Sequence, residues 1–156
     1  MLTSRQIGSR RAKQAGNALE EMIDDVNRSS WYLIHLPPCG GRWVAKGKFV
    51  GQKQPFDFFG RHRETDTAIF FDAKSCANEY GINLGDKKIF EHHQIEALLG
   101  MRSNKTVSGV LIRSEHHGLF YWLPAQPGFN AYHAWDSPDL ILLGKTPRLE
   151  GLIPTH

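Results

Sequence analysis

Apolar side chains near the start of the chain repeat at helical spacing. They recur every three or four residues and form one stripe, made of Leu19, Met22, Ile23 and Val26. This stripe predicts a helix from about Ala12 to Asn27. The next apolar run, Trp31 to Leu36, is rich in β-forming residues. Two prolines and a glycine follow it closely, so it predicts a strand that stops there.

The middle of the chain shows the spacing of strands. Arg42 to Val50 alternates loosely around Gly47, which predicts a small basic hairpin. Phe56 to His62 and Thr67 to Lys74 predict two more strands, because both are short, apolar and β-prone. The polar residues Arg63 to Asp66 lie between these two strands and predict the turn that joins them.

The rest of the chain predicts one more helix and further strands. A loop from Ser75 to Lys88 leads into a helix from about Phe90 to Arg102. Val107 to Arg113 and Leu119 to Leu123 predict a strand pair, and Leu140 to Leu143 fits either an edge strand or a dimer contact. This order predicts an α/β fold, in which a mixed sheet carries helices on both faces.

Length and composition narrow the class of protein. The 156 residues fit one compact domain, and 40% hydrophobic and 22% charged residues are ordinary for a globular chain. No apolar run is long enough to span a bilayer and no leader opens the chain, so we expect a soluble protein of the cytoplasm. The two cysteines, Cys39 and Cys76, do not indicate a disulfide scaffold.

Positive charge is concentrated in three short segments, although the net charge is only +3. Acidic residues lie elsewhere, in a cluster from Glu20 to Asp25 and at isolated positions. This separation indicates a DNA-binding surface beside an acidic pocket, and a solvated basic surface is the alternative. The residues predicted to contact DNA are Arg10, Arg11, Lys13, Arg42, Lys46, Lys48, Lys53, Arg61 and Arg63.

Two aspartates occupy corresponding positions in the two middle strands. If these strands form a hairpin with a symmetric loop of two or four residues, the turn is centred between Glu64 and Thr65, and Asp57 stands opposite Asp72. Cross-strand partners have Cβ atoms about 4.5–5.5 Å apart. Two carboxylates at that separation repel each other unless a cation or a proton lies between them, and Mg²⁺ prefers such oxygen ligands.

Lys74 lies two residues after Asp72 and therefore points to the same face of the strand. An ammonium group there can orient an attacking water and offset charge on a phosphate. The three side chains predict a metal-dependent site for phosphodiester hydrolysis. A surface salt bridge on a hairpin is the alternative, but the neighbours of Asp72 are strongly apolar, which is unusual for surface charges.

The segments around this hairpin extend the pattern from Gly16 to Ala125. They are Gly16-Asn17-Ala18-Leu19-Glu20-Glu21 with Asn27 and Tyr32, Ile34-His35 before Pro37, Gln54-Pro55 before Asp57 with Gly60 after it, Phe71-Asp72-Ala73-Lys74, Phe90-Glu91-His92-His93-Gln94-Ile95-Glu96, Val110-Leu111-Ile112 and Tyr121-Trp122-Leu123. In this order they resemble the RecU-type Holliday junction resolvases of the PD-(D/E)xK nuclease superfamily. Asp72 stands where RecU proteins usually carry Glu.

This resemblance implies a restriction-endonuclease-like nuclease that uses Mg²⁺, with Mn²⁺ able to substitute. It assigns the metal site to Glu20, Asp57, Asp72 and Ala73, water orientation to Lys74 and a supporting polar role to Gln94. Helical periodicity does not choose between Glu20 and Asp25, because both border the apolar stripe. Gln94 shares a stripe with Phe90, Leu98 and Met101, which predicts an inward amide; an amide bonded only to backbone is the alternative.

The resemblance also implies a substrate and an assembly, namely four-way DNA junctions cut by a homodimer. The expected organisation is a basic arm (1–15), a nuclease core (16–125) with the hairpin at about 40–54, and a C-terminal extension (126–156). That hairpin is shorter than the stalk of RecU proteins, which suggests a compact variant such as phages carry. Two rival functions stay open: a related nuclease acting on flap, nicked or duplex-end DNA, and a junction-binding protein without catalysis.

The histidine pairs His92-His93 and His116-His117 raise the question of zinc. Adjacent residues of a helix point about 100° apart, so the first pair is poorly placed to chelate one ion. No cysteine stands at finger-like spacing from either pair. Zinc is therefore the less favoured metal.

Overall fold

The computed structural model describes residues 3–36, 41–44, 48–51 and 54–154, without the side chains of residues 5, 7–16, 41–44 and 48–51. A six-stranded mixed sheet forms the centre of the described part, in the order β1-β4-β5-β7-β8-β10. Only β5 and β7 pair in parallel within this sheet. The bounds are β1 (Trp31–His35), β4 (Phe58–His62), β5 (Ala68–Cys76), β7 (Thr106–Ser114), β8 (Leu119–Pro124) and β10 (Ile141–Gly144).

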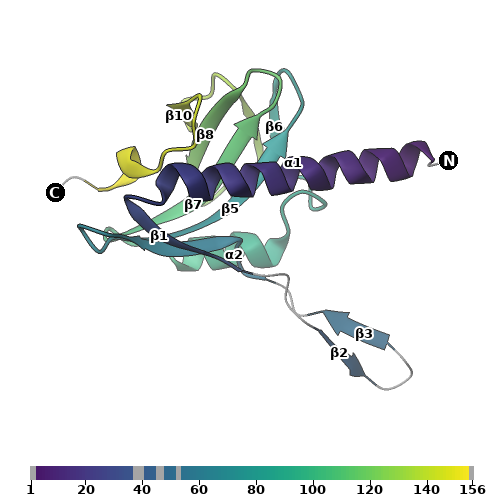
Figure 1. Ribbon diagram of the computed structural model, residues 1–156, viewed down its shortest axis with the longest axis horizontal. Coiled ribbons are helices and arrows are strands. Elements are labelled where there is room, and N and C mark those ends of the chain that lie inside the picture. Colours follow the sequence, from purple (N-terminus) through teal and green to yellow (C-terminus); the bar gives the residue numbers. More distant parts are fainter. Residues whose placement is uncertain (1–2, 37–40, 45–47, 52–53, 155–156) are drawn as a thin grey trace.

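Two further strand pairs lie outside this sheet. The hairpin of β2 (Gly41–Val44) and β3 (Lys48–Gly51) confirms the predicted small hairpin, and Figure 1 draws it apart from the six-stranded sheet. The pair of β6 (Gly81–Asn83) and β9 (Tyr132–Ala134) lies where the sequence predicted only loops. Three-residue strands carry too few residues to show a period, which is why their pattern is invisible in the sequence.

The first helix, α1 (Ser4–Asn27), begins eight residues earlier than its apolar stripe predicts. The Thr3 hydroxyl accepts a hydrogen bond from the Gln6 backbone N–H, and the Gln6 side chain accepts one from the Thr3 N–H. This capping box satisfies two N–H groups that a helix start otherwise leaves unpaired. The Thr-x-x-Gln pattern of residues 3 to 6 was the sequence signal that could have placed this helix start. Residues of the expected N-terminal arm from Ser4 onward thus belong to the helix.

The two helices cover opposite faces of the sheet, as predicted. On one face Leu19 and Ile23 of α1 pack with Phe58 and Phe71, and all four are fully buried. On the other face Leu98 of α2 (His92–Gly100) packs in a second cluster. Figure 1 shows α1 crossing the sheet, with its N-terminal part extending past the strands. Burial of apolar area on both faces is the main stabilising contribution to such a fold.

The C-terminal segment is tied to the end of α1 by a buried amide. Asn27 is 1% exposed, and its Nδ2 donates to the Pro147 carbonyl while its Oδ1 accepts from the Leu149 N–H. A short 3-10 helix, η2 (Glu150–Leu152), follows. The run predicted at Leu140 to Leu143 forms β10, an edge strand paired with β8. Among the described residues, no helix is long and apolar enough to cross a membrane.

Candidate active site

The β4–β5 hairpin has the register that the turn arithmetic predicts. Phe58 pairs with Phe71 and Arg61 with Ala68, and the His62 N–H donates to the Thr67 carbonyl, so four residues form the loop. Carried one residue beyond β4, this register sets Asp57 opposite Asp72. The predicted register is confirmed from Phe58 to Arg61, and the hydrogen bond from the Asp57 N–H to Asp72 shows that the two aspartates are neighbours.

Backbone hydrogen bonds hold both carboxylates in place. The Asp57 N–H donates to Oδ1 of Asp72 at 2.9 Å, and the Ala73 N–H donates to Oδ2 of Asp57 at 2.9 Å. Asp72 is 0% exposed, and its second oxygen, Oδ2, is buried with no hydrogen-bond partner among the described residues. A buried carboxylate oxygen without a partner is unfavourable, so this atom marks a place where a ligand belongs.

The charges of Asp57 and Asp72 also favour a ligand at this place. Burial, followed by the charge of Asp57, raises the pKa of Asp72 to about 7, while Lys74 and the Asp57 N–H act in the opposite direction. The folded chain thus disfavours two negative charges at this place. A divalent cation would remove that conflict and keep both carboxylates ionised.

Lys74 lies on the same face of β5 as Asp72, two residues further along the strand. Its side chain is half-buried, and its Nζ lies 5.8 Å from the centroid of the Phe90 ring. An ammonium held over an aromatic face keeps its charge while losing mobility. Phe90, which directly precedes the second helix, therefore restricts where Lys74 can point.

The helix acid Glu20 lies on α1 and contacts the end of β1. Its Oε1 is 3.3 Å from Nε2 of His35, at the end of β1, and both side chains are about one-third exposed. Burial raises the pKa of Glu20, His35 lowers it, and the charge of Asp57 raises it. Glu20 is thus close enough to Asp57 to sense its charge. Asp25, the other candidate on the helix, is largely exposed and pairs with Arg28.

A comparison with protein-family models matches residues 41–138, well over half of the chain, to the family described as Recombination protein U, RecU. The chain belongs to the RecU family. This is a family of Holliday junction resolvases, so the match supports a junction-resolving nuclease function. A comparison with curated proteins finds no match.

The family match covers the hairpin but not the first helix. Asp57, Asp72, Lys74 and Gln94 lie inside residues 41–138, whereas Glu20 lies before them. The resemblance described above begins at Gly16, so its first segment is outside the match. The assignment of Glu20 to the metal site stays a prediction.

Gln94 is placed differently from its predicted stripe. It is half-buried at the start of α2, and its Oε1 accepts a hydrogen bond from the Glu91 N–H at 3.0 Å. Phe90 and Leu98 are buried, but Met101 is 39% exposed, so the four residues do not share one inward face. The amide oxygen caps the helix, because the first N–H groups of a helix lack partners within it. Its role beside the carboxylates stays a prediction.

The donor set fits a hard divalent ion of the kind predicted. In the described part of the chain, no group of three or more His, Cys, Asp or Glu side chains is assembled to hold a metal by itself. Mg²⁺ does not need such a group, since it is commonly bound by one or two carboxylates together with water and substrate phosphate. Asp57 and the unpartnered Oδ2 of Asp72 supply these two carboxylates, and the Ala73 carbonyl is an additional oxygen on the same strand.

Two contacts near Asp57 were missed from the sequence. The Leu36 N–H donates to the Asp57 carbonyl at 2.8 Å, and the Gln54 Nε2 donates to the Leu36 carbonyl at 2.8 Å. Leu36 and Gln54 flank the segment that contains the β2–β3 hairpin, so these bonds hold its two ends beside Asp57 and the β4–β5 hairpin. The sequence signal that could have indicated these contacts was the pair Gln54-Pro55, directly before Asp57.

The predicted DNA contacts divide into those that the structure describes and those that it does not. Arg61 pairs with Asp66 at 2.6 Å, and the Arg63 guanidinium lies 5.7 Å from the centroid of the Tyr32 ring. Outside the described residues or side chains lie Arg10, Arg11, Lys13, Arg42, Lys46, Lys48 and Lys53. The role of all nine in DNA binding stays a prediction.

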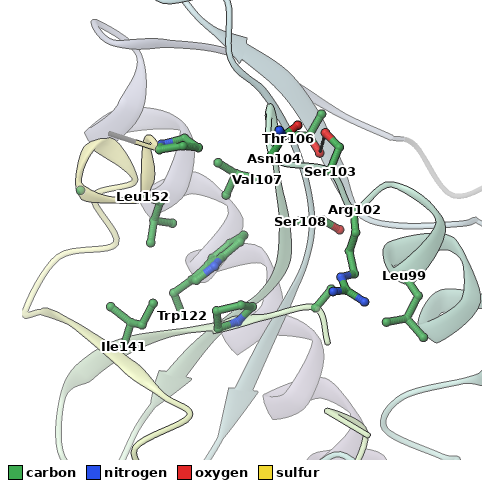
Figure 2. A pocket seen from close by; sticks show the side chains of 14 residues that line it. Leu99, Arg102, Ser103, Asn104, Thr106, Val107, Ser108, Trp122, Ile141 and Leu152 are labelled. Carbon is green, nitrogen blue, oxygen red and sulfur yellow. Dashed lines mark hydrogen bonds between the residues drawn. The ribbon is translucent and has the colours of Figure 1, made fainter. Parts of the chain in front are cut away.

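A cavity of about 770 Å³ lies away from this hairpin. It is lined by residues at the end of α2 and just after it, by the start of β7, by β8 and by the C-terminal segment, among them Arg102, Thr106, Trp122 and Leu152 (Figure 2). None of Asp57, Asp72 and Lys74 lines it. The histidines of α2 also contact separate partners, His92 with Glu96 and His93 with Glu91.

Proposed function

We propose that this RecU-family chain cuts four-way DNA junctions by Mg²⁺-dependent hydrolysis of phosphodiester bonds at Asp57, Asp72 and Lys74, with Mn²⁺ able to substitute. The observation that carries the proposal is the buried, unpartnered Oδ2 of Asp72 beside a second carboxylate. The raised pKa of Asp72 supports it, because a nearby cation would lower this pKa and keep the carboxyl group fully ionised at neutral pH.

Each side chain has a distinct task in this proposal. Asp57 and Asp72 would hold the ion, together with the Ala73 carbonyl. The ion would supply a more acidic bound water and neutralise the phosphate. Lys74 would orient the attacking water and offset negative charge that develops on the phosphate. Glu20, held by His35, would add negative charge behind Asp57.

We also propose that the chain acts as a homodimer. A four-way junction has two-fold symmetry, and symmetric cuts on opposing strands need two active sites related by the same axis. Because the substrate is DNA, we propose the cytoplasm as the place of action, at the nucleoid or, for a phage-encoded chain, in the host.

The site is tested with Asp57→Asn and Lys74→Ala on labelled junctions. Both variants should bind the junction within about threefold of the wild type and lose cleavage by about 10²–10³-fold, the size expected for a group that acts in the transition state. Unchanged product yield would rule out the site. Salt must be the same in all assays, because phosphate contacts alone change affinity steeply.

Substrate choice and assembly need two further measurements. A four-way junction should be cut well above matched duplex, nicked and flap DNA, and equal cleavage of all four would reject junction specificity. Mixing wild-type chains with Asp57→Asn chains should yield junctions cut on one strand only, in proportion to mixed dimers. A mass of one chain in solution with full activity would contradict the dimer.

A further inference from the structure

One face of the six-stranded sheet carries Asp72, Lys74 and an exposed aromatic side chain, Tyr32. The registers pair Tyr32 with Arg61 and Ile34 with Phe59, and Phe59 with Phe70. Because directly paired residues and every second residue of a strand share a face, Tyr32 lies on the face of Asp72 and Lys74.

This face is open at its outer strand. Tyr32 is 52% exposed and Ile34 is 37% exposed, although both belong to a strand of the central sheet. Neighbouring apolar groups that remain exposed beside an active site indicate a contact surface. We call the surface of Tyr32, Ile34 and Arg63 the Tyr32 platform.

An arginine completes this platform. The Arg63 guanidinium lies 5.7 Å from the centroid of the Tyr32 ring, and its Nε donates to the Arg28 carbonyl at 3.1 Å. An aromatic ring with a guanidinium over it combines a flat apolar surface with donors suited to phosphate. Half of Tyr32 stays exposed although the arginine covers part of its ring.

A hollow of about 270 Å³ adjoins the platform. It lies where the end of α1 meets the edge strand β1, and it is lined by Tyr32, Arg63, Arg28, Asp24, Asn27, Trp31 and Leu33. Trp31 is 1% exposed, and its indole N–H has no hydrogen-bond partner among the described residues, although its ring contacts His62 edge-on. The Arg28 side chain forms an exposed ion pair with Asp25 and lies near Asp24, and exposed ion pairs are weak enough to exchange for a phosphate.

The distance to the catalytic carboxylates suits one DNA strand. The Leu36 N–H bonds to the Asp57 carbonyl, and Tyr32 lies four residues earlier on β1. At about 3.3 Å per residue this is about 13 Å along the strand. The same length corresponds to about four nucleotides at about 3.4 Å each.

We infer that the Tyr32 platform binds an unpaired nucleotide of the junction, with its base against Tyr32 and a flanking phosphate on Arg63 and Arg28. Bases inside a duplex are already stacked on each other, so a protein ring finds an exposed base face only where pairing is interrupted, as at a branch point. The inference rests on the proposed function, because it assumes that the scissile phosphate lies at Asp57 and Asp72.

The test measures binding in EDTA, so that it does not depend on cleavage. A junction with 2-aminopurine at each branch-point position in turn reports stacking on an aromatic ring by its fluorescence. Wild type should quench one position, and Tyr32→Ala should abolish the quenching and weaken junction binding by on the order of tenfold. Tyr32→Phe should restore both, because it keeps the ring.

Matched variants separate this contact from a general one. Tyr132→Ala removes a tyrosine of β9 that is 56% exposed, and it should leave junction binding unchanged. Arg63→Ala should weaken junction binding, whereas Arg63→Lys should recover most of it, because a lysine keeps the positive charge that contacts the phosphate. Thermal unfolding of every variant checks that the fold is kept.

Three results would overturn the inference. Tyr32→Ala could behave like Tyr132→Ala, it could weaken duplex and junction binding equally, or it could lower the mass of the particle in solution, which would identify a protein interface instead. Failure of the proposed function looks different: wild type would show Tyr32-dependent quenching in EDTA but no cleavage when Mg²⁺ is added.

Discussion

Strands and a helix both bring acids to the candidate active site, and they hold them in different ways. Asp57 and Asp72 face each other across a hairpin, and each carboxylate accepts a backbone N–H from the opposite strand. Glu20 stands on α1 and is held by a side chain, His35, at a partly exposed position. The hairpin pair therefore has a geometry set by the backbone, whereas Glu20 depends on how the helix packs.

This difference shows which acids are prepared to bind an ion. In the hairpin pair, Asp72 has an oxygen without a partner among the described residues and a strongly raised pKa. The folded chain therefore disfavours its negative charge when no ligand is bound. Burial raises the pKa of Glu20 as well, but this carboxylate already has a partner, His35, that opposes the shift. We expect the hairpin acids to be indispensable and Glu20 to modulate them.

The largest effect should come from Asp72→Asn. It should lower junction cleavage by about 10³-fold or more while junction binding stays within about threefold, because the ion loses a charged ligand. Single-turnover assays on labelled junctions measure this. Asp25→Asn, at an exposed acid of α1, is the matched control and should retain full activity. If Asp72→Asn still cleaves within tenfold of wild type, the hairpin acids are not indispensable and do not differ from Glu20 as described.

The second prediction concerns stability and pH without metal. Folding raises the pKa of Asp72 from 3.8 to about 7, so the folded state binds the proton more tightly than the unfolded state. Its contribution to stability is intact below about pH 4 and is lost as pH rises to about 7, by at most about 4 kcal/mol. Denaturant unfolding in EDTA should therefore show Asp72→Asn gaining stability over wild type across this range.

Added Mg²⁺ supplies the complementary result. The ion should stabilise wild type above pH 7 and leave Asp72→Asn nearly unchanged, because a ligand stabilises only the state that binds it. If wild type and Asp72→Asn differ by the same free energy of unfolding at pH 4 and pH 8, folding does not raise the pKa of Asp72 as described.

A smaller effect should follow from Glu20→Gln. We expect a loss of about tenfold in cleavage, mostly as a higher Mg²⁺ requirement, because one negative charge behind Asp57 is removed while the hairpin stays intact. A Mg²⁺ titration of the cleavage rate measures it. A loss as large as that of Asp72→Asn would make Glu20 an equal ligand and remove the distinction between strand and helix acids.

The smallest effect should come from the contact at the ends of the β2–β3 segment. Gln54→Glu keeps the shape but loses the donor to the Leu36 carbonyl, so cleavage should fall by about threefold to tenfold through a looser Asp57. Gln126→Glu, at an exposed glutamine, is the control. Equal rates for both variants would show that Asp57 is positioned without this contact.

Much of the hairpin could be predicted because its information is local. The strand pattern and the polar residues between the strands set the turn, and the turn sets the register that brings Asp57 and Asp72 together. The helix start was placed too late because the apolar stripe ends where α1 leaves the sheet, while the capping box lies further back at Thr3. The Gln94 amide bonds to backbone, which is one of the two alternatives that the sequence left open, and the period alone could not choose between them.

The sequence by itself determined the face-to-face aspartates, the lysine beside them and the mixed sheet with helices on both sides. Strand alternation has a period of two and a hairpin has one turn, so these features follow from residues close together in the chain. The tertiary structure decided that Glu20 pairs with His35, that Leu36 and Gln54 fasten Asp57, and that Tyr32 shares the face of Asp72. Those contacts join distant segments, and only packing in three dimensions determines which of them meet.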